Sequence, residues 1–463
     1  MAVRFIAEIR RTHSCGELTS KNIGEDVVLF GWVHNRRDHG GAVFIDLRDR
    51  AGLTQVVFEE DVAKEVHERA GSLRLEYCVG VKGKVVSRGA MVNPKLKTGE
   101  IEVKATELEI FNRSETPPFL IEDRIDTAEE KRLAYRYLDL RRPVLQKALI
   151  ARSAMNAVTR TYMSSRGFLE LETPYMGKYT PGGARNFLVP SRHNPGKFYA
   201  LAESPQLYKQ LFMVSGFDRY FQIVKCFRDE DPRLDRQPEF TQIDVEMSFV
   251  SQEDVFEIVE GLLVKLWKDL LEVEIPAPFL RMDFDESMRR YGNDKPDLRF
   301  GLEHVALTDL IKRFGPEGGV PLMHEAVQKG GIVKAMVIPA DRALSRAESD
   351  KLEEYVKGMG AAGLGRAKVA ESGEWTQSPF ARIIAPALRQ AINEACRARP
   401  GDLILFHFGR ESMVHTVMAN LRVHVAKKLG LIPEYGSGGQ WKFLWVVNPP
   451  LFEYDEEAKT WAA

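Results

Sequence analysis

The sequence predicts an α+β protein of several domains, and two changes in residue pattern along its 463 residues predict it. Short runs rich in β-branched residues fill positions 27–110, and glycine, asparagine and charged turns separate them, which is typical of a small β-barrel. From Pro143 onward apolar residues recur at helical spacing, and strands and helices then follow one another. At roughly 100–200 residues per domain, this length fits about three domains.

The composition is that of an ordinary globular protein, with 44% hydrophobic and 28% charged residues. Lys plus Arg number 65 against 66 for Asp plus Glu, so a polyanion must bind to local basic patches. Four cysteines without a CxxC pair argue against a disulfide scaffold and a structural zinc site. The N-terminal residues lack the apolar core of a signal peptide, and no run of about 18 apolar residues occurs. We therefore expect a cytoplasmic protein without a membrane span.

The first predicted domain covers residues 1–112 and contains five strands, with a helix over 62–73 between the third and the fourth. That order is the order of an OB-fold, whose open face commonly binds oligonucleotides. Another small β-barrel without a ligand is the alternative that the strand pattern leaves open.

The residue pattern after the barrel predicts a hinge, a second domain and an inserted domain. Residues 113–141 are polar and contain Pro117-Pro118, which predicts the hinge. We expect a second domain with an antiparallel sheet over 142–299, an inserted α/β domain over 300–425, and a return to the second domain over 426–463.

Residues 202–214 place an amide and an ammonium at the start of a predicted helix. Gln206 and Lys209 follow Ser204-Pro205 and are three positions apart, so both project from one face of the first turn. Together they suit a small carboxylate ligand. A solvated helix start is the alternative.

A predicted antiparallel hairpin follows, with its strands at 220–227 and 241–249 and a long loop rich in arginine. Arg228 ends the first strand, and its planar guanidinium suits a phosphate better than a lysine does. On the return strand Gln242, Asp244 and Glu246 alternate onto one face. Arginine and carboxylates together suit a nucleoside triphosphate with magnesium, whereas an ion-pair network at a sheet edge is the alternative.

These segments resemble the class II aminoacyl-tRNA synthetases, and specifically bacterial aspartyl-tRNA synthetases. Phe-Arg-Asp-Glu at 227–230 and Pro-Glu-Phe-Thr-Gln-Ile-Asp-Val-Glu at 238–246 are similar to the motif 2 hairpin of that family. Arg-Tyr-Leu-Asp-Leu-Arg-Arg at 136–142 and the helix before Glu172-Thr173-Pro174 are similar to motif 1, which implies a homodimer. The segment 204–210 is similar to the aspartate-binding segment.

The resemblance implies an aspartate–tRNA ligase that activates aspartate with ATP and Mg²⁺, without a prosthetic group, and transfers it to tRNA. It implies catalytic roles for Arg228 and Glu230. It also assigns binding residues, with ATP at Arg228, Asp229, Glu230 and Gln237, and aspartate at Ser204, Gln206, Lys209 and Asp244. The ammonium of Lys209 would pair with the side-chain carboxylate of aspartate, and asparagine would leave it buried without a partner.

The barrel would read the anticodon. The resemblance assigns this role to Arg37, His39, Phe44, Gln55 and Glu102. Phe44 would stack on an unpaired base, with a place in the barrel core as the alternative. His39 is similar to the residue of the non-discriminating enzymes, which implies that both tRNA-Asp and tRNA-Asn are charged.

Some positions depart from the family pattern. Gly182 and Asn186 replace acidic residues, and Asn448-Pro449 replaces Asp-Phe. No segment before Ala463 resembles motif 3, so the sequence leads us to expect a form that is truncated before that motif.

Two other functions remain open at this stage. A tRNA-binding remnant without catalytic activity would fit the missing motif. The related asparagine enzyme shares the fold, but Lys209 and the large insertion argue against it. The spacing of His407, His415 and His424 predicts no zinc site.

Overall fold

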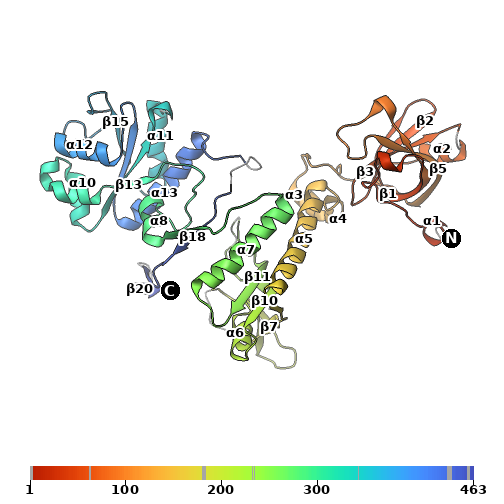
Figure 1. Ribbon diagram of the computed structural model, residues 1–463, viewed down its shortest axis with the longest axis horizontal. Helices are drawn as coiled ribbons and strands as arrows, with labels where there is room; N and C mark the ends of the chain where they lie inside the picture. Colours follow the sequence, from red (N-terminus) through yellow and green to blue (C-terminus); the bar gives the residue numbers. More distant parts are fainter. Residues whose placement is uncertain are drawn as a thin grey trace. The chain divides into compact units, whose positions relative to one another are not determined.

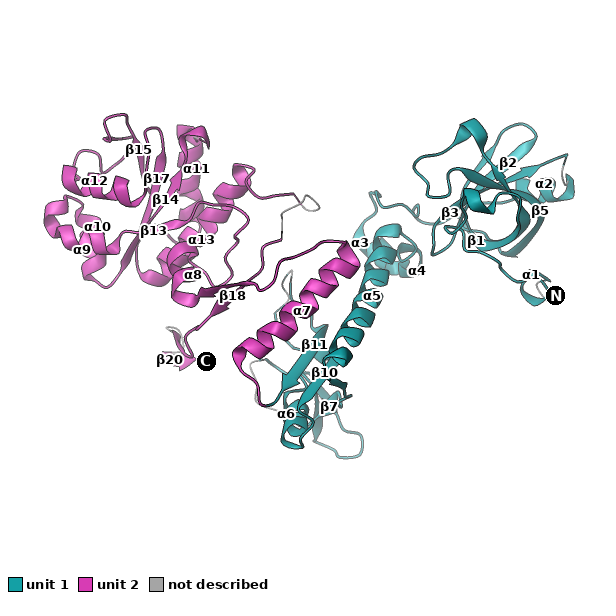
Figure 2. Ribbon diagram, viewed as in Figure 1, with its two compact units in different colours: residues 1–248 teal, residues 249–463 magenta. Residues whose placement is uncertain are grey.

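The computed structural model describes residues 4–61, 64–179, 184–231, 233, 235–342, 344–434, 441–455 and 459–462. The chain forms two compact units, residues 1–248 and 249–463 (Figures 1 and 2). Within the described ranges, no helix combines the length and the apolar character that crossing a membrane requires.

Unit 1 begins with a closed barrel whose strand order is β1-β2-β3-β5-β4. Its elements are α1 (Arg4–Ala7), η1 (Ser20–Asn22), β1 (Asp26–Asp38), β2 (Ala42–Arg48), β3 (Leu53–Glu59), α2 (Lys64–Gly71), β4 (Cys78–Ser87), η2 (Gly89–Met91) and β5 (Ile101–Asn112). Helix α2 lies between the third and the fourth strand, which confirms the predicted OB-fold. The expected helix also included Val62 and Ala63, which lie outside the described residues.

Strand β2 shows how the barrel separates its core from its surface. Val43, Ile45 and Leu47 are buried in the barrel core, and each is followed or preceded by a residue that faces outward. Phe44 is half-buried on that outer face. The alternative that Phe44 belongs to the barrel core is therefore wrong.

In the part of the chain that the structure describes, the remainder of unit 1 consists of four helices, two of them in the hinge region, and two small sheets. The elements are α3 (Glu129–Ala134), α4 (Arg136–Asp139), α5 (Pro143–Ser165), β6 (Leu169–Glu170), β7 (Met176–Gly177), β8 (Leu188–Pro190), β9 (Phe198–Leu201), α6 (Gln206–Val214), β10 (Arg219–Phe227) and β11 (Glu239–Met247). One sheet has the order β11-β10-β6 and the other β7-β9-β8. Strand β10 is the central strand of the first sheet, and its Tyr220, Phe221 and Val224 are buried.

The hinge region carries a small core and a charged centre of its own. Phe119, Ile121 and Leu138 form an apolar cluster. The buried carboxylate of Asp139 accepts hydrogen bonds from Arg136 and Arg142, at 2.5 and 2.9 Å. A carboxylate buried among several guanidinium groups stays ionised and fixes the turn that leads into α5.

Unit 2 contains a long helix, a mixed α/β domain and a short terminal hairpin. The elements are α7 (Gln252–Leu271), β12 (Leu280–Asp283), α8 (Phe284–Tyr291), β13 (His304–Ala306), α9 (Thr308–Phe314), η3 (Gly315–Gly318), α10 (Pro321–Gln328), β14 (Ile332–Ile338), η4 (Ala340–Arg342), α11 (Arg346–Lys357), β15 (Gly365–Val369), β16 (Trp375–Thr376), α12 (Pro386–Ala395), β17 (Leu403–Gly409), α13 (Glu411–Lys428), β18 (Leu444–Val447), β19 (Glu453–Asp455) and β20 (Thr460–Ala462). The five-stranded sheet has the order β13-β14-β17-β15-β16.

Strands β12 and β18 pair in parallel, so the two ends of the α/β segment meet. Trp445 of β18 stacks on Phe256 of α7 at 4.3 Å between ring centroids and donates a hydrogen bond to Glu260. After β18, Asn448 adopts a φ of 57° and its amide donates to Asp283. Asparagine tolerates this left-handed conformation better than most residues, which is a local reason for Asn at this position.

A buried lysine lies inside the α/β segment of unit 2. The ammonium of Lys334, on β14, donates to the carbonyl of Met288 and contacts His415 Nδ1 at 2.9 Å. Burial lowers the pKa of Lys334 to about 7, although the charge of Glu411 opposes this shift. His415 contacts Glu411 through its other ring nitrogen, at 3.3 Å.

We expect the stability of unit 2 to rise between pH 7 and about pH 10 because of Lys334. The unfolded chain keeps the ordinary pKa of 10.5, so in this window it binds a proton that the folded protein does not bind. Below pH 7 both states are protonated, and the full cost of burying the charge remains. Thermal unfolding followed by tryptophan fluorescence tests this expectation, because all tryptophans except Trp32 lie in unit 2.

Lys334→Met is the comparison for this titration, since methionine fills a similar volume without a charge. As the pH rises from 7 to 10, the free energy of unfolding of the wild type should increase relative to that of the variant. A difference that stays constant over this range would contradict the lowered pKa.

Candidate active site

The register of two strands places the predicted phosphate-binding arginine. Strands β10 and β11 pair without a shift from Arg219↔Met247 to Phe227↔Glu239. The next amide, of Arg228, donates to the carbonyl of Pro238 at 2.9 Å. This bond places the backbone of Arg228 at the end of the hairpin, where the loop meets β11.

Arg228 lines a pocket of about 260 Å³ at this end of the hairpin. The lining residues are Arg228, Glu230, Asp235, Arg236, Gln237 and Phe240. The guanidinium carbon of Arg228 lies 5.2 Å from the centroid of the Phe240 ring, as a cation–π contact requires. Its Nε is buried and has no hydrogen-bond partner among the described residues. The guanidinium thus retains donors for a ligand anion.

Three of the four residues predicted to bind ATP line this pocket, namely Arg228, Glu230 and Gln237. Asp229 does not line it, because its side chain is exposed and its amide donates to Arg185 on a neighbouring loop. Glu230 is held by an ion pair with Arg236 at 3.1 Å. Arg236 and Phe240 also line the pocket, and the sequence pattern assigned no role to either. The signals that could have found them are the positive charge of Arg236 in the predicted loop and the aromatic ring of Phe240 at its end.

The predicted aspartate-binding lysine forms the centre of a second, buried cluster. Lys209 Nζ lies 2.8 Å from Asp244 Oδ1 and 3.2 Å from Glu246 Oε2. Burial alone would lower the pKa of Lys209, but its hydrogen bonds and ion pairs with the two carboxylates outweigh burial and raise it. Lys209 is therefore charged at neutral pH. An ammonium has three donors, so one remains for a ligand after the two carboxylates are served.

Side chains of β10 form the floor beside this cluster. Gln222 Oε1 accepts hydrogen bonds from Thr173 and Tyr220, at 2.9 and 3.0 Å. Burial raises the pKa of the Cys226 thiol to about 11, with a further contribution from the negative charge of Asp244. The thiol is therefore protonated at neutral pH and unsuited to act as a nucleophile.

Ser204 and Gln206, which were also predicted to bind aspartate, have surroundings different from those of Lys209. Ser204 lines a small hollow together with Asn186 and Tyr208. Gln206 begins α6 with an exposed side chain, so it does not share the buried environment of Lys209. Gly182, which departs from the family pattern, lies outside the described residues.

The five residues predicted to read the anticodon come together on the outer face of the barrel. Arg37 donates to Gln55 at 3.2 Å, and Gln55 donates to Glu102 at 2.8 Å. His39 and Phe44 pack edge to face, with 5.9 Å between ring centroids. Arg37 and Phe44 are register partners in β1 and β2. An aromatic surface next to a chain of hydrogen-bonding groups suits the stacking and edge recognition of unpaired bases.

The described residues contain no group of three or more His, Cys, Asp or Glu side chains arranged to hold a metal ion. His407 and His415 are buried separately, on β17 and α13. His424 instead stacks on Tyr355 at 4.0 Å between ring centroids.

Family models match both the barrel and the part of the chain that carries the candidate active site. Residues 27–111 match the family model of the OB-fold nucleic acid binding domain. Residues 128–461 match that of the class II tRNA synthetases (D, K and N). The second match covers well over half of the chain.

The curated relatives with high similarity are bacterial enzymes. An aspartate–tRNA(Asp/Asn) ligase of Anaeromyxobacter dehalogenans (strain 2CP-1) is 76% identical over 99% of this chain and 76% of its own length. One of Geotalea uraniireducens is 49% identical over the whole chain and 76% of its own length. The expectation of a truncated form is not confirmed by these matches.

Among solved structures, asparaginyl-tRNA synthetase of Pyrococcus horikoshii with asparaginyl-adenylate superposes with a TM-score of 0.54 at 18% identity, over 89% of this chain and 96% of that one. At this identity the likeness shows the shared fold alone. The family matches and the 76% identical relative are specific, and with them the chain belongs to the class II tRNA synthetases of the D, K and N group, within the bacterial aspartyl-tRNA synthetases.

Proposed function

We propose that this protein is a non-discriminating aspartate–tRNA ligase, which charges both tRNA-Asp and tRNA-Asn. The observation that carries the ligase activity in this proposal is the β10–β11 hairpin with the adjacent helix α6. The hairpin presents a guanidinium with an unpaired Nε at its end, and α6 supplies a charged, buried lysine that pairs with β11. A nucleotide phosphate and the carboxylate of an amino acid are the anions that these two cations suit. The names of relatives with up to 76% identity agree with this assignment.

In the first step, a carboxylate oxygen of aspartate attacks the α-phosphorus of ATP, which enters with Mg²⁺ as a substrate. The bond to the leaving pyrophosphate breaks, and aspartyl-adenylate forms. Arg228 would bind the α-phosphate and stabilise the charge that builds up on its oxygens. Glu230 and Gln237, which line the same pocket, would hold the rest of the nucleotide.

In the second step, a ribose hydroxyl of the terminal adenosine of tRNA attacks the carbonyl carbon of the adenylate, and AMP leaves. The protein supplies no nucleophile in either step, so its contribution is position and charge. Lys209 would bind the side-chain carboxylate of aspartate through its third donor, and Asp244 would keep the ammonium protonated and in place.

The barrel would bind the anticodon on the face that carries Arg37, Phe44 and Gln55. We also propose that the enzyme works as a homodimer in the cytoplasm. Three apolar residues of α5, the helix that resembles motif 1, are about half exposed and support a protein interface there: Val144, Leu149 and Ile150.

Arg228→Lys should lower the rate of aspartate-dependent ATP–pyrophosphate exchange by about 10²–10³-fold, because an ammonium cannot reproduce the planar fork on a phosphate. Exchange measured with labelled pyrophosphate tests this step without tRNA. Arg219→Lys is the matched control, since Arg219 begins the same strand at the opposite end and donates to the carbonyl of Arg166. A folded wild-type protein without exchange would contradict the proposed function.

Phe44→Leu should weaken binding of an anticodon stem-loop by about 1–3 kcal/mol, the usual contribution of one stacked base. Phe30→Leu is the control, because Phe30 is also half-buried on the barrel but packs in a separate cluster with Phe5 and Phe111. Fluorescence anisotropy with a labelled RNA measures both. Equal losses in the two variants would argue against stacking at Phe44.

His39→Leu should shift charging toward tRNA-Asp, since the resemblance assigns the choice between the two tRNAs to this position. The ratio of the kcat/KM values for the two tRNAs measures the shift. The rate of pyrophosphate exchange should stay constant, because His39 lies in the barrel. An unchanged ratio would remove this position from the account of tRNA choice.

A further inference from the structure

Arg141 connects the barrel to the segment that leads into α5. Its guanidinium lies 4.6 Å from the centroid of the Trp32 ring, on β1. It also donates to Glu76 Oε2 at 2.7 Å. Through Arg141, the last residue but one before α5 is bonded directly to the barrel.

Glu76 is the centre of this contact. Both of its carboxylate oxygens accept hydrogen bonds from Arg48, at 2.8 and 2.7 Å, so one carboxylate serves two arginines. Arg48 in turn contacts His34 Nδ1 at 2.8 Å. Glu76 and Arg48 are buried, with side chains only 4% and 7% exposed. Ion pairs with this degree of burial are screened much less by water and salt than surface pairs.

The backbone of Glu76 is strained, which supports a specific role for this residue. Its φ is 63°, in the left-handed region that a residue other than glycine or asparagine rarely adopts. The amide of Glu76 donates to Val33 on β1 at 2.8 Å, which holds the unusual conformation. Strain of this kind persists where the surroundings fix it, and it marks sites of function more often than ordinary turns.

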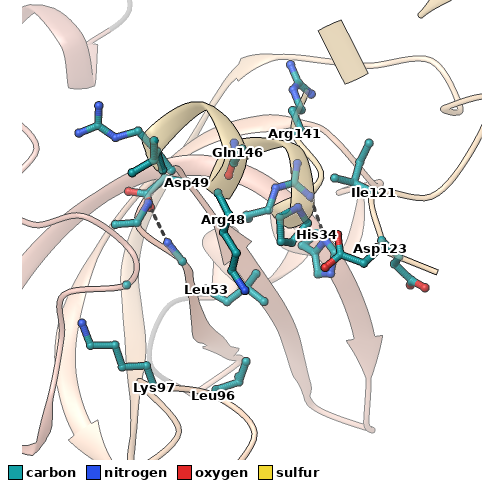
Figure 3. A pocket seen from close by; sticks show the side chains of 18 of the residues that line it. His34, Arg48, Asp49, Leu53, Leu96, Lys97, Ile121, Asp123, Arg141 and Gln146 are labelled. Carbon is teal, nitrogen blue, oxygen red and sulfur yellow. Dashed lines mark hydrogen bonds between the residues drawn. The ribbon is translucent and has the colours of Figure 1, made fainter. Parts of the chain in front are cut away.

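Two hollows flank this buried contact. A pocket of about 450 Å³ is lined by barrel residues, among them His34 and Arg48, and by hinge and α5 residues, among them Ile121 and Gln146 (Figure 3). A second pocket of about 420 Å³ is lined by Trp32 and Glu76. Arg141 lines both pockets. The contacts of Arg141 with Trp32 and Glu76 therefore join the barrel to the hinge region beside both pockets.

The same two strands carry this contact at one end and the anticodon face at the other. In the β1–β2 register, Trp32 pairs with Arg48, and Arg37 pairs with Phe44. Five residues of β1 and four of β2 separate the two pairs, with a bulge in β1 between Val33 and Asn35, and the separation is about 14–17 Å. A paired strand ribbon is stiff over this length. The orientation of the anticodon face is therefore set by the end that Arg141 holds.

We propose that Arg141, Glu76 and Arg48 are positioning residues, which fix the barrel relative to the rest of unit 1 so that tRNA held by its anticodon also reaches the candidate active site at the β10–β11 hairpin. The inference rests on the proposed function. RNA that contacts two linked surfaces gains affinity from the second only when the linkage holds both in the right geometry.

Arg141→Gln tests this role, because it removes the contact to the barrel and leaves the buried pair of Glu76 and Arg48 intact. The matched control is Arg136→Gln, in the same segment, since Arg136 bonds to Asp139 within the hinge region. Two labelled RNAs are titrated by fluorescence anisotropy: an anticodon stem-loop and the whole tRNA-Asp transcript.

We expect Arg141→Gln to bind the stem-loop like the wild type and to bind the whole tRNA about tenfold more weakly, as the gain from the second contact is lost. Arg136→Gln should bind both RNAs like the wild type. Glu76→Gln, checked for folding by circular dichroism, should show the same split as Arg141→Gln.

Three results would overturn the inference. The first is that the Arg141 and Arg136 variants bind both RNAs with the same affinities. The second is that Arg141→Gln loses the same affinity for both RNAs, which would indicate damage to the barrel, and the third is that the wild type binds stem-loop and whole tRNA equally tightly. Pyrophosphate exchange by the same wild-type preparation separates this outcome from a failure of the proposed function, since exchange needs no tRNA.

Discussion

The antiparallel register of β10 and β11 is the constraint on which the candidate active site depends. It sets Gln222 opposite Asp244 and ends the ladder at Phe227 and Glu239. Arg228 can then only stand at the mouth of the hairpin, whereas Asp244 and Glu246 face Lys209 of α6. A shift by one residue would turn each of these side chains to the opposite face of the sheet and separate the lysine from its carboxylates.

Charge is arranged differently at the two places where anions are expected. The positive charge of Lys209 is compensated by two carboxylates, so the lysine is held in one orientation and keeps its proton. Arg228 contacts the aromatic ring of Phe240 instead of a carboxylate, and its Nε has no hydrogen-bond partner among the described residues. This difference suits a selective contact to a small carboxylate at the lysine and a stronger, less selective one to a phosphate at the arginine.

Local patterns were sufficient to predict much of this structure. Period-two strands with one intervening helix predicted the barrel, and the alternation of Gln242, Asp244 and Glu246 predicted a polar face that Lys209 meets. Contacts between distant segments could not be predicted in this way. Glu76 and Arg141 are 65 residues apart in the chain and meet only in the folded protein. Phe240 lines the pocket from β11, which begins at Glu239, two residues before the predicted strand. Ser204, which was predicted to bind aspartate, lines a small hollow with Asn186 and Tyr208.

The central claim is that the β10–β11 hairpin and Lys209 of α6 together bind an acidic amino acid joined to a nucleotide. Calorimetric titration with a non-hydrolysable aspartyl-adenylate analogue and its asparaginyl counterpart tests it most directly, because binding does not require turnover. We predict that the aspartyl analogue binds at least about 100-fold more tightly, because the third donor of Lys209 meets a charged carboxylate in aspartate and only a neutral amide in asparagine. Equal affinity for the two analogues, or no binding by a folded protein, would contradict the account.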